Sequence, residues 1–167
     1  LVPPIGYLDK LRKICDKHGI LLIFDEVITG WGRTGSPFAA QEFNVTPDII
    51  TLAKATTNGV VPMGVVAVRD GIYETVVSSA PEGAIELFHG YTYSGIPVAV
   101  AAALAVQDIF EKENIFNRVR EISPYFQEAL HSLKDLDCVE NIRGYGLLGG
   151  VDIKKRDKPG KAGFQVY

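Results

Sequence analysis

The chain has 167 residues, of which 47% are hydrophobic and 22% are charged, and its formal net charge is −3. This length and composition are typical of one globular domain with a sizeable core and argue against a disordered chain. The two signs of charge are interspersed and no apolar stretch approaches the length of a membrane span, so we expect neither nucleic acid nor a membrane as a partner.

The first predicted elements are a helix and a strand. Apolar residues between positions 6 and 18 recur at a spacing that places them on one helix face. The residues of this face are Leu8, Leu11, Ile14 and Cys15. Gly19 suits the position just past the C-terminal end of such a helix. The apolar run from Ile20 to Phe24 follows at once and predicts a strand that is buried on both faces, as in parallel sheets.

Two further strands are expected, at residues 48–52 and 64–68, because both stretches are short, apolar and β-branched. The region between the first two strands is rich in glycine, with room for a short helix at residues 38–43. Alternation of helix and strand with short links favours an α/β fold, a mostly parallel sheet covered by helices.

Helices are expected from Pro97 onward. Residues 97–113 predict a helix that is apolar nearly all round and therefore mostly buried, and residues 115–133 predict a more amphipathic helix in which Pro124 is a candidate break. Two strands follow, within residues 139–153. The pattern thus changes from α/β to α+β, which predicts a boundary to a second, smaller domain near residues 115–125.

Asp25 stands where the first strand ends. An ionised carboxylate buried there costs several kcal/mol unless it has a partner. Its position fits a helix N-cap or a turn residue as well as a functional group. In open α/β sheets, however, ligands bind beyond the carboxyl ends of the strands. The functional interpretation is a carboxylate that faces a cationic group of a ligand.

Lys54 follows the second strand and precedes the small residues 55–57. Most lysines are solvated surface residues, but one that is desolvated at a packed strand end can become a nucleophile that forms Schiff bases. A lysine and an aspartate on neighbouring strand ends would suit pyridoxal phosphate. The amine would form the imine, and the carboxylate would keep the pyridine nitrogen protonated.

Several stretches together resemble the signature of class III pyridoxal-phosphate aminotransferases. They are the segment from Leu22 to Gly35, the tripeptide Pro47-Asp48-Ile49 and the tripeptide Leu52-Ala53-Lys54, in which Lys54 comes 29 positions after Asp25. Residues 88–95, followed at once by a helix, are similar to the ω-amino acid:pyruvate branch of that family. Ile96 departs from this branch, whose members often have His there. The resemblance covers essentially the whole chain.

This resemblance implies a partial fold-type-I pyridoxal-phosphate-dependent transferase. Residues 1–115 would be part of the large, cofactor-binding domain, and residues 116–167 would be the truncated start of the smaller C-terminal domain. The family's phosphate loop and ring-stacking aromatic residue would lie upstream of Leu1, and its carboxylate-binding arginine beyond Tyr167. We therefore expect the piece by itself to be inactive.

The resemblance also implies roles for individual residues. Lys54 corresponds to the Schiff-base lysine, Asp25 to the partner of the pyridine nitrogen, and Val27 to the residue that packs under the cofactor ring. Thr92 corresponds to the threonine that binds the cofactor phosphate of the neighbouring subunit, so a homodimer would share its active sites.

The residues themselves support these roles unevenly. Val27 is two positions beyond Asp25, which predicts the same strand face for both. Thr92 precedes an early-helix proline, and helix starts bind phosphate, but without the resemblance it would be an ordinary loop threonine. Glu26 and Arg33 are candidates either for contact with substrate or for a structural role, in a salt bridge or in stabilising the loop.

The function that follows is amino transfer from an amine or ω-amino acid to a keto acid such as pyruvate, with Lys54 also acting as general base and acid. An aminomutase or a decarboxylating transaminase would use the same cofactor. For the piece alone, a non-catalytic α/β binding or assembly module is the alternative.

The cysteines and the chain ends bear on location and completeness. Cys15 and Cys138 lie far apart without metal-ligand spacing, so we expect no metal site and a reducing, cytoplasmic compartment. The chain begins at Leu1 with neither Met nor a signal peptide and stops at Tyr167 without a helix cap, so we expect a piece of a longer protein.

Overall fold

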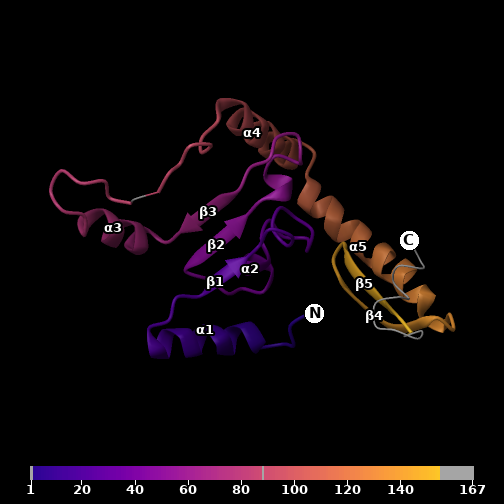
Figure 1. Cartoon of the computed structure of the whole chain (residues 1–167). Helices are drawn as coiled ribbons and strands as arrows, with labels where there is room; N and C mark the ends of the chain where they lie inside the picture. The colour runs from indigo at the N-terminus through magenta and orange to yellow at the C-terminus, as the bar shows by residue number, and fades with distance from the viewer. Residues whose placement is uncertain (1, 88, 155–167) are drawn as a thin grey trace.

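The computed structural model describes residues 2–87 and 89–154 (Figure 1). Helices and strands alternate up to α3, which confirms the α/β class expected for this part of the chain. The elements are, in order, α1 (Tyr7–His18), β1 (Ile23–Asp25), α2 (Ala39–Glu42), β2 (Ile49–Leu52), a 3-10 turn (Lys54–Thr56), β3 (Val65–Val68), α3 (Asp70–Ser78), α4 (Pro97–Lys112), α5 (Ile115–His131), a second 3-10 turn (Ser132–Asp135), β4 (Val139–Tyr145) and β5 (Leu148–Ile153).

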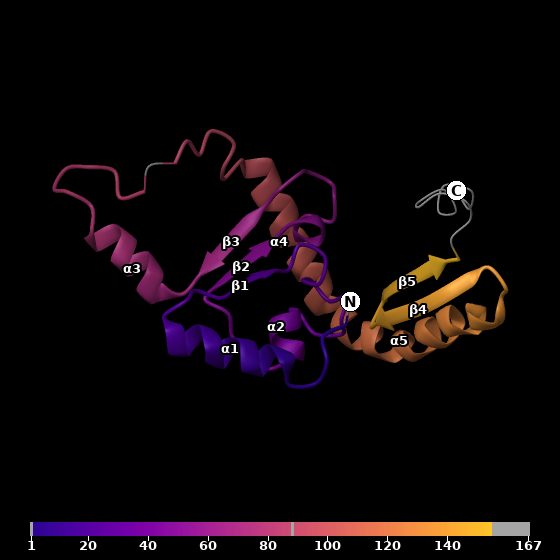
Figure 2. The same cartoon turned by 60° about the horizontal axis from the view of Figure 1, so that its bottom comes forward.

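The first sheet has the strand order β1-β2-β3. β1 and β2 run parallel, as predicted, with Ile23 opposite Ile49 and Asp25 opposite Thr51, whereas β3 runs antiparallel to β2. Because β1 and β2 run in the same direction, both end at the same edge of the sheet. Figures 1 and 2 show α4 beside that edge.

Helix α1 ends as the sequence predicts. Gly19 adopts a left-handed backbone (φ 61°), which lets the N–H of Ile20 donate to the carbonyl of Cys15 at 2.9 Å. Cys15 is buried together with Leu22 and with Val45 from the loop before β2. The remaining members of this core are partly buried and come from α1 and β1, namely Leu8, Leu11 and Phe24.

The prediction that the first strand is buried on both faces is wrong for the described residues. α1 covers Leu22 and Phe24, but Ile23, on the other face, is 55% exposed. The expectation that the helix after Pro97 is mostly buried is likewise wrong, because α4 buries Ala99 and Ala103 but leaves Leu104 exposed. Both β1 and α4 have the apolar sequence of a buried element. The described residues, however, pack against only one side of each, so the other side is exposed.

Asp48 fastens the start of β2 to its neighbours. Its carboxylate accepts hydrogen bonds from the backbone N–H of Leu22 (2.7 Å) and from Nη1 of Arg12 (2.7 Å), and it lies 3.2 Å from Nη1 of Arg69. The Leu22 N–H, followed by the Arg12 guanidinium, lowers the pKa of this carboxyl below its ordinary value of 3.8.

Asp48→Asn is expected to lower the free energy of unfolding at neutral pH by about 1.5–3 kcal/mol, because the amide loses its charge-assisted bonds to the two arginines. A lowered folded-state pKa stabilises the fold above the unfolded-state pKa, and this contribution disappears as pH falls through the folded-state value. Urea unfolding of the full-length protein at pH 7 and near pH 3 checks this. Equal stability of wild type and variant at pH 7 would contradict the role given to Asp48.

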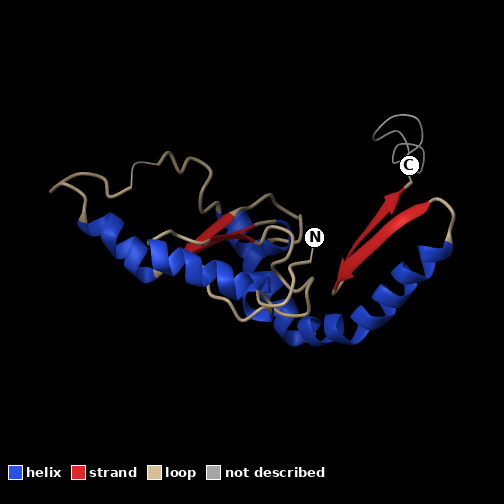
Figure 3. Cartoon of the chain, turned by 90° about the horizontal axis from the view of Figure 1, so that it is seen from below, coloured by secondary structure: helices blue, strands red, loops and turns tan. Residues whose placement is uncertain are grey.

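The hairpin of β4 and β5 lies along α5 (Figure 3). Nε2 of Gln127 on α5 donates to the carbonyls of Gly146 (2.8 Å) and Leu148 (3.1 Å) at the hairpin turn. Helix α5 runs through Pro124, so the candidate break there is wrong. The division into two domains stays a prediction, and residues 155–167 of the predicted second domain lie outside the described residues.

Asn114 separates α4 from α5 with a left-handed backbone (φ 50°). Within the part of the chain that the structure describes, no helix is long and apolar enough to cross a membrane. Across those same residues, no cluster of three or more His, Cys, Asp or Glu side chains is arranged to hold a metal ion.

Candidate active site

Lys54 begins the 3-10 turn that follows β2, and its backbone is unusual. Its φ is 45°, in a left-handed region that costs a residue with a side chain about 1–2 kcal/mol. The backbone N–H and the hydroxyl of Thr56 both donate to the carbonyl of Ala53, each at 3.0 Å, which closes the turn. The three residues after Lys54 are buried, but Lys54 itself is exposed, so the expected desolvation of this lysine is not found in the described chain.

Lys54 lines a cavity of about 780 Å³ together with residues from two other segments. Met63 comes from the loop before β3, and Tyr91 and Thr92 come from the loop before α4. The rings of His89 and Tyr91 lie 4.2 Å apart on this wall. The structure therefore brings Lys54 and Thr92 of one chain to the same cavity.

Asp25 lies at the same sheet edge but does not line the Lys54 cavity. It is the last residue of β1, it is exposed, and strand alternation places it on the face opposite Phe24, away from α1. The backbone N–H of the next residue, Glu26, donates to the carbonyl of Thr51 at 2.9 Å. This bond ties the end of β1 to β2 just before the chain reaches Lys54.

The argument that placed Val27 on the strand face of Asp25 is wrong. β1 ends at Asp25, and Val27 lies in the following turn, where strand alternation no longer applies. Its backbone N–H donates to Oδ1 of Asp25 at 3.1 Å. Val27 thus closes the turn against the carboxylate, and its packing under a cofactor ring stays a prediction.

Glu26 is a loop anchor, which settles one of the alternatives left open by the sequence. Its side chain is 1% exposed and accepts hydrogen bonds from the backbone N–H groups of Ala39 (2.6 Å) and Ala40 (2.8 Å) and from Oγ1 of Thr29 (3.2 Å). It thereby fixes the start of α2 to the end of β1. Gly30 packs closely against the backbone of Glu26. An added Cβ at Gly30 would lie 2.7 Å from the Glu26 carbonyl oxygen, too close for any larger residue.

Arg33 also stabilises the glycine-rich loop. Its Nη1 donates to the carbonyl of Ile28 at 2.9 Å, and its own carbonyl accepts from the N–H of Leu147 at 2.8 Å. The second bond joins the loop to the turn between β4 and β5. Gly146 in that turn has φ 57°, and an added Cβ would come within 2.4 Å of the Arg33 carbonyl, so glycine is required there.

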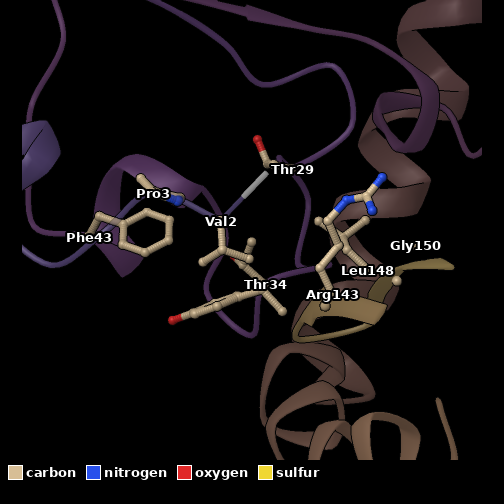
Figure 4. A pocket seen from close by; sticks show the side chains of 11 residues that line it. Val2, Pro3, Thr29, Thr34, Phe43, Arg143, Leu148 and Gly150 are labelled. Carbon is tan, nitrogen blue, oxygen red and sulfur yellow. The ribbon is translucent and has the colours of Figure 1, made fainter. Parts of the chain in front are cut away.

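A second cavity, of about 320 Å³, lies between the glycine-rich loop and the hairpin (Figure 4). Arg143 lines it and forms an ion pair with Asp152 at 2.5 Å. Tyr145, also in its wall, donates its hydroxyl to Oε1 of Glu42 at 2.6 Å. Burial, and then this hydrogen bond, raises the pKa of Tyr145 to about 12. Lys54, Asp25 and Thr92 do not line this cavity.

The sequence of the chain is similar to one known protein family and to curated members of it. Residues 1–165 match the family described as Aminotransferase class-III. The omega-amino acid–pyruvate aminotransferase of Pseudomonas putida is 49% identical over 100% of this chain and 38% of its own length. The beta-alanine–pyruvate aminotransferase of Pseudomonas aeruginosa is also 49% identical, over 100% of this chain and 39% of its own length.

The chain is also similar to solved transaminase structures. An (S)-enantioselective omega-transaminase from Thermomicrobium roseum superposes with a TM-score of 0.86 at 43% identity, over 92% of this chain and 34% of that one. The chain therefore spans little more than a third of the length of the curated relatives named above.

Proposed function

The chain belongs to the class-III aminotransferase family, and from this membership we propose that the protein containing it is a pyridoxal-5′-phosphate-dependent aminotransferase. It moves an amino group from an amine or ω-amino acid to a keto acid such as pyruvate. The names of the two curated relatives support this substrate class, because one pairs pyruvate with an ω-amino acid and the other pairs pyruvate with β-alanine.

The observation that carries the proposal is the placement of Lys54. Its amine stands on a strained turn at the carboxyl end of β2 and lines a cavity of about 780 Å³, at the sheet edge where Asp25 ends β1. Strained backbone of this kind concentrates at active sites. An amine, a carboxylate and the hydroxyl of Thr92 are the groups that an aldehyde, a pyridine nitrogen and a phosphate require, so the described residues fit this cofactor.

Each residue then has a task. When bound, pyridoxal phosphate supplies an aldehyde for amines and a ring that accepts electrons from the substrate carbon. Lys54 would hold the cofactor covalently, and its amine would move a proton onto and off the substrate carbon as general acid and base. Asp25 would keep the pyridine nitrogen protonated, Thr92 would donate its hydroxyl to the cofactor phosphate of the neighbouring subunit, and Val27 would pack beneath the ring.

The reaction is tested by product analysis. The full-length protein is incubated with pyridoxal phosphate, β-alanine and pyruvate, and alanine is measured by chromatography. We expect one alanine for each β-alanine consumed. Consumption of β-alanine without formation of alanine, or isomerisation of the amine without consumption of pyruvate, would contradict amino transfer, and the second result would point to an aminomutase.

Thr92→Ala is expected to weaken cofactor binding by about 10- to 150-fold, because a charge-assisted hydrogen bond contributes roughly 1.5–3 kcal/mol. At saturating cofactor, the chemistry of Lys54 should remain intact. Equilibrium titration of the apo-protein with pyridoxal phosphate measures the change. Wild-type affinity would contradict a phosphate contact by Thr92.

Subunit mixing decides whose phosphate Thr92 binds. One chain carries Thr92 and Lys54 on the same cavity, so the proposal of a homodimer with shared sites relies on the family resemblance. If the site is shared, mixing Thr92→Ala with Lys54→Ala subunits creates one whole site per mixed dimer, and activity at low cofactor partly recovers. No recovery, with exchange confirmed by mass, would place Thr92 in the site of its own subunit.

A further inference from the structure

The indole of Trp31 lies where three segments of the candidate site meet. Its Nε1–H donates to Oγ1 of Thr56 at 2.9 Å, in the turn that begins with Lys54. Its ring lies 6.0 Å from that of Phe110 on α4, at an interplanar angle of 21°, and 5.2 Å from the ring of Phe38, edge to face. One side chain thus joins the loop after Asp25, the lysine turn and the helix that follows Thr92.

The hydrogen bonds from Trp31 to the lysine turn have a fixed direction. An indole N–H can only donate, so the Thr56 hydroxyl must accept from Trp31 and must send its single proton elsewhere. That proton goes to the carbonyl of Ala53 at 3.0 Å, the residue directly before Lys54. Thr56 is 3% exposed, so solvent does not readily replace either bond.

The lysine turn needs such support. Lys54 has φ 45°, and strained backbone persists only where its surroundings hold it. The carbonyl of Ala53 belongs to the peptide unit that precedes the Lys54 Cα, so fixing it fixes the direction from which the lysine side chain starts. Trp31 is itself held in a left-handed backbone (φ 62°), with its N–H donating to the carbonyl of Pro37 at 2.6 Å.

We propose that Trp31, acting through Thr56, is a positioning residue for Lys54. It holds Lys54 in its left-handed backbone conformation. It also fixes the position of the lysine turn relative to the segments that carry Asp25 and Thr92. The proposal rests on the function assigned above to Lys54. It adds a residue that touches neither cofactor nor substrate but sets where the amine stands.

Three variants separate the hydrogen bonds from packing. Trp31→Phe keeps an aromatic ring against Phe110 and Phe38 but removes the N–H donor. Thr56→Val removes the hydroxyl at nearly constant volume, so it breaks both bonds. Thr56→Ser keeps a hydroxyl that can accept from Trp31 and donate to Ala53, and it serves as the matched control.

The readout is the rate at which the cofactor attaches to Lys54. Full-length apo-protein is mixed with pyridoxal phosphate, samples are reduced with borohydride at intervals, and the pyridoxyl adduct on Lys54 is counted by mass spectrometry over a range of pH. We expect Trp31→Phe and Thr56→Val to attach the cofactor about 3- to 10-fold more slowly, the factor that one hydrogen bond supplies. Thr56→Ser should match wild type, and in the slow variants kcat should fall while KM for the amine is unchanged.

The possible outcomes are distinguishable. Wild-type attachment rates in both Trp31→Phe and Thr56→Val, whatever their melting temperatures, would overturn the positioning role. If Trp31→Phe does not fold, the comparison of Thr56→Val with Thr56→Ser decides alone, and equal rates in that pair overturn the role. Absence of any adduct on Lys54 in wild type would instead overturn the proposed function, and this inference with it.

Discussion

Replacing Lys54 with Ala in the full-length protein is expected to abolish amino transfer and borohydride-reducible attachment of pyridoxal phosphate. On the proposed roles of Lys54, the variant would lose both the covalent anchor and the group that moves the proton. General acid–base catalysis alone contributes about 10²–10⁴-fold, so a loss of at least about 100-fold in kcat is the minimum. Alanine formation from pyruvate and the mass of the reduced protein measure the two effects.

A second lysine provides the control for this variant. Lys13 is exposed on α1, away from the cavity of Lys54, so Lys13→Ala should leave attachment and turnover unchanged. Reductive labelling of the Lys54→Ala protein at the wild-type level would remove the assignment of Lys54.

Asp25→Asn is expected to keep the cofactor bound but to slow turnover by about 100-fold or more, roughly 3 kcal/mol in the barrier. The amide can still accept the hydrogen bond from the N–H of Val27, so the turn after β1 should be preserved. It could not stabilise a positive charge on the pyridine nitrogen, as the carboxylate is proposed to do. Steady-state kinetics at saturating cofactor measure the change.

Asp9→Asn removes an exposed carboxylate from α1 and should leave turnover unchanged. Turnover of Asp25→Asn within about threefold of wild type, less than about 1 kcal/mol, would count against the role of the carboxylate.

Some elements could be predicted because their own residues carry the pattern of a helix. The apolar spacing before Gly19 gave α1, and Pro97 at the first position of α4 marked the start of that helix. Helix α3 (Asp70–Ser78) was not predicted, although Ile72 and Val76, and Tyr73 and Val77, recur at helical spacing; none of its residues is buried. The short length of β1 was missed because the apolar run before Ile23 continues without a break, although the chain pairs with β2 only from Ile23 onward.

The candidate site was predictable where strand ends define it and not where tertiary contacts do. Asp25 and Lys54 could be placed because each follows an apolar strand. The buried position of Glu26 could not, since its partners Ala39 and Ala40 lie 13 and 14 residues further along the chain. The bond from Trp31 to Thr56 spans 25 residues and has no sequence signal of its own.

Attachment of the cofactor to Lys54 is the central claim, and peptide mapping of the wild-type protein tests it most directly. Between Arg33 and Arg69, Lys54 is the only site at which trypsin cleaves, and a pyridoxyl group blocks that cleavage. After incubation with pyridoxal phosphate, reduction and digestion, we predict one uncut peptide, residues 34–69, carrying a single pyridoxyl group. Cleavage after an unmodified Lys54, with the pyridoxyl group on another lysine, would contradict the assignment.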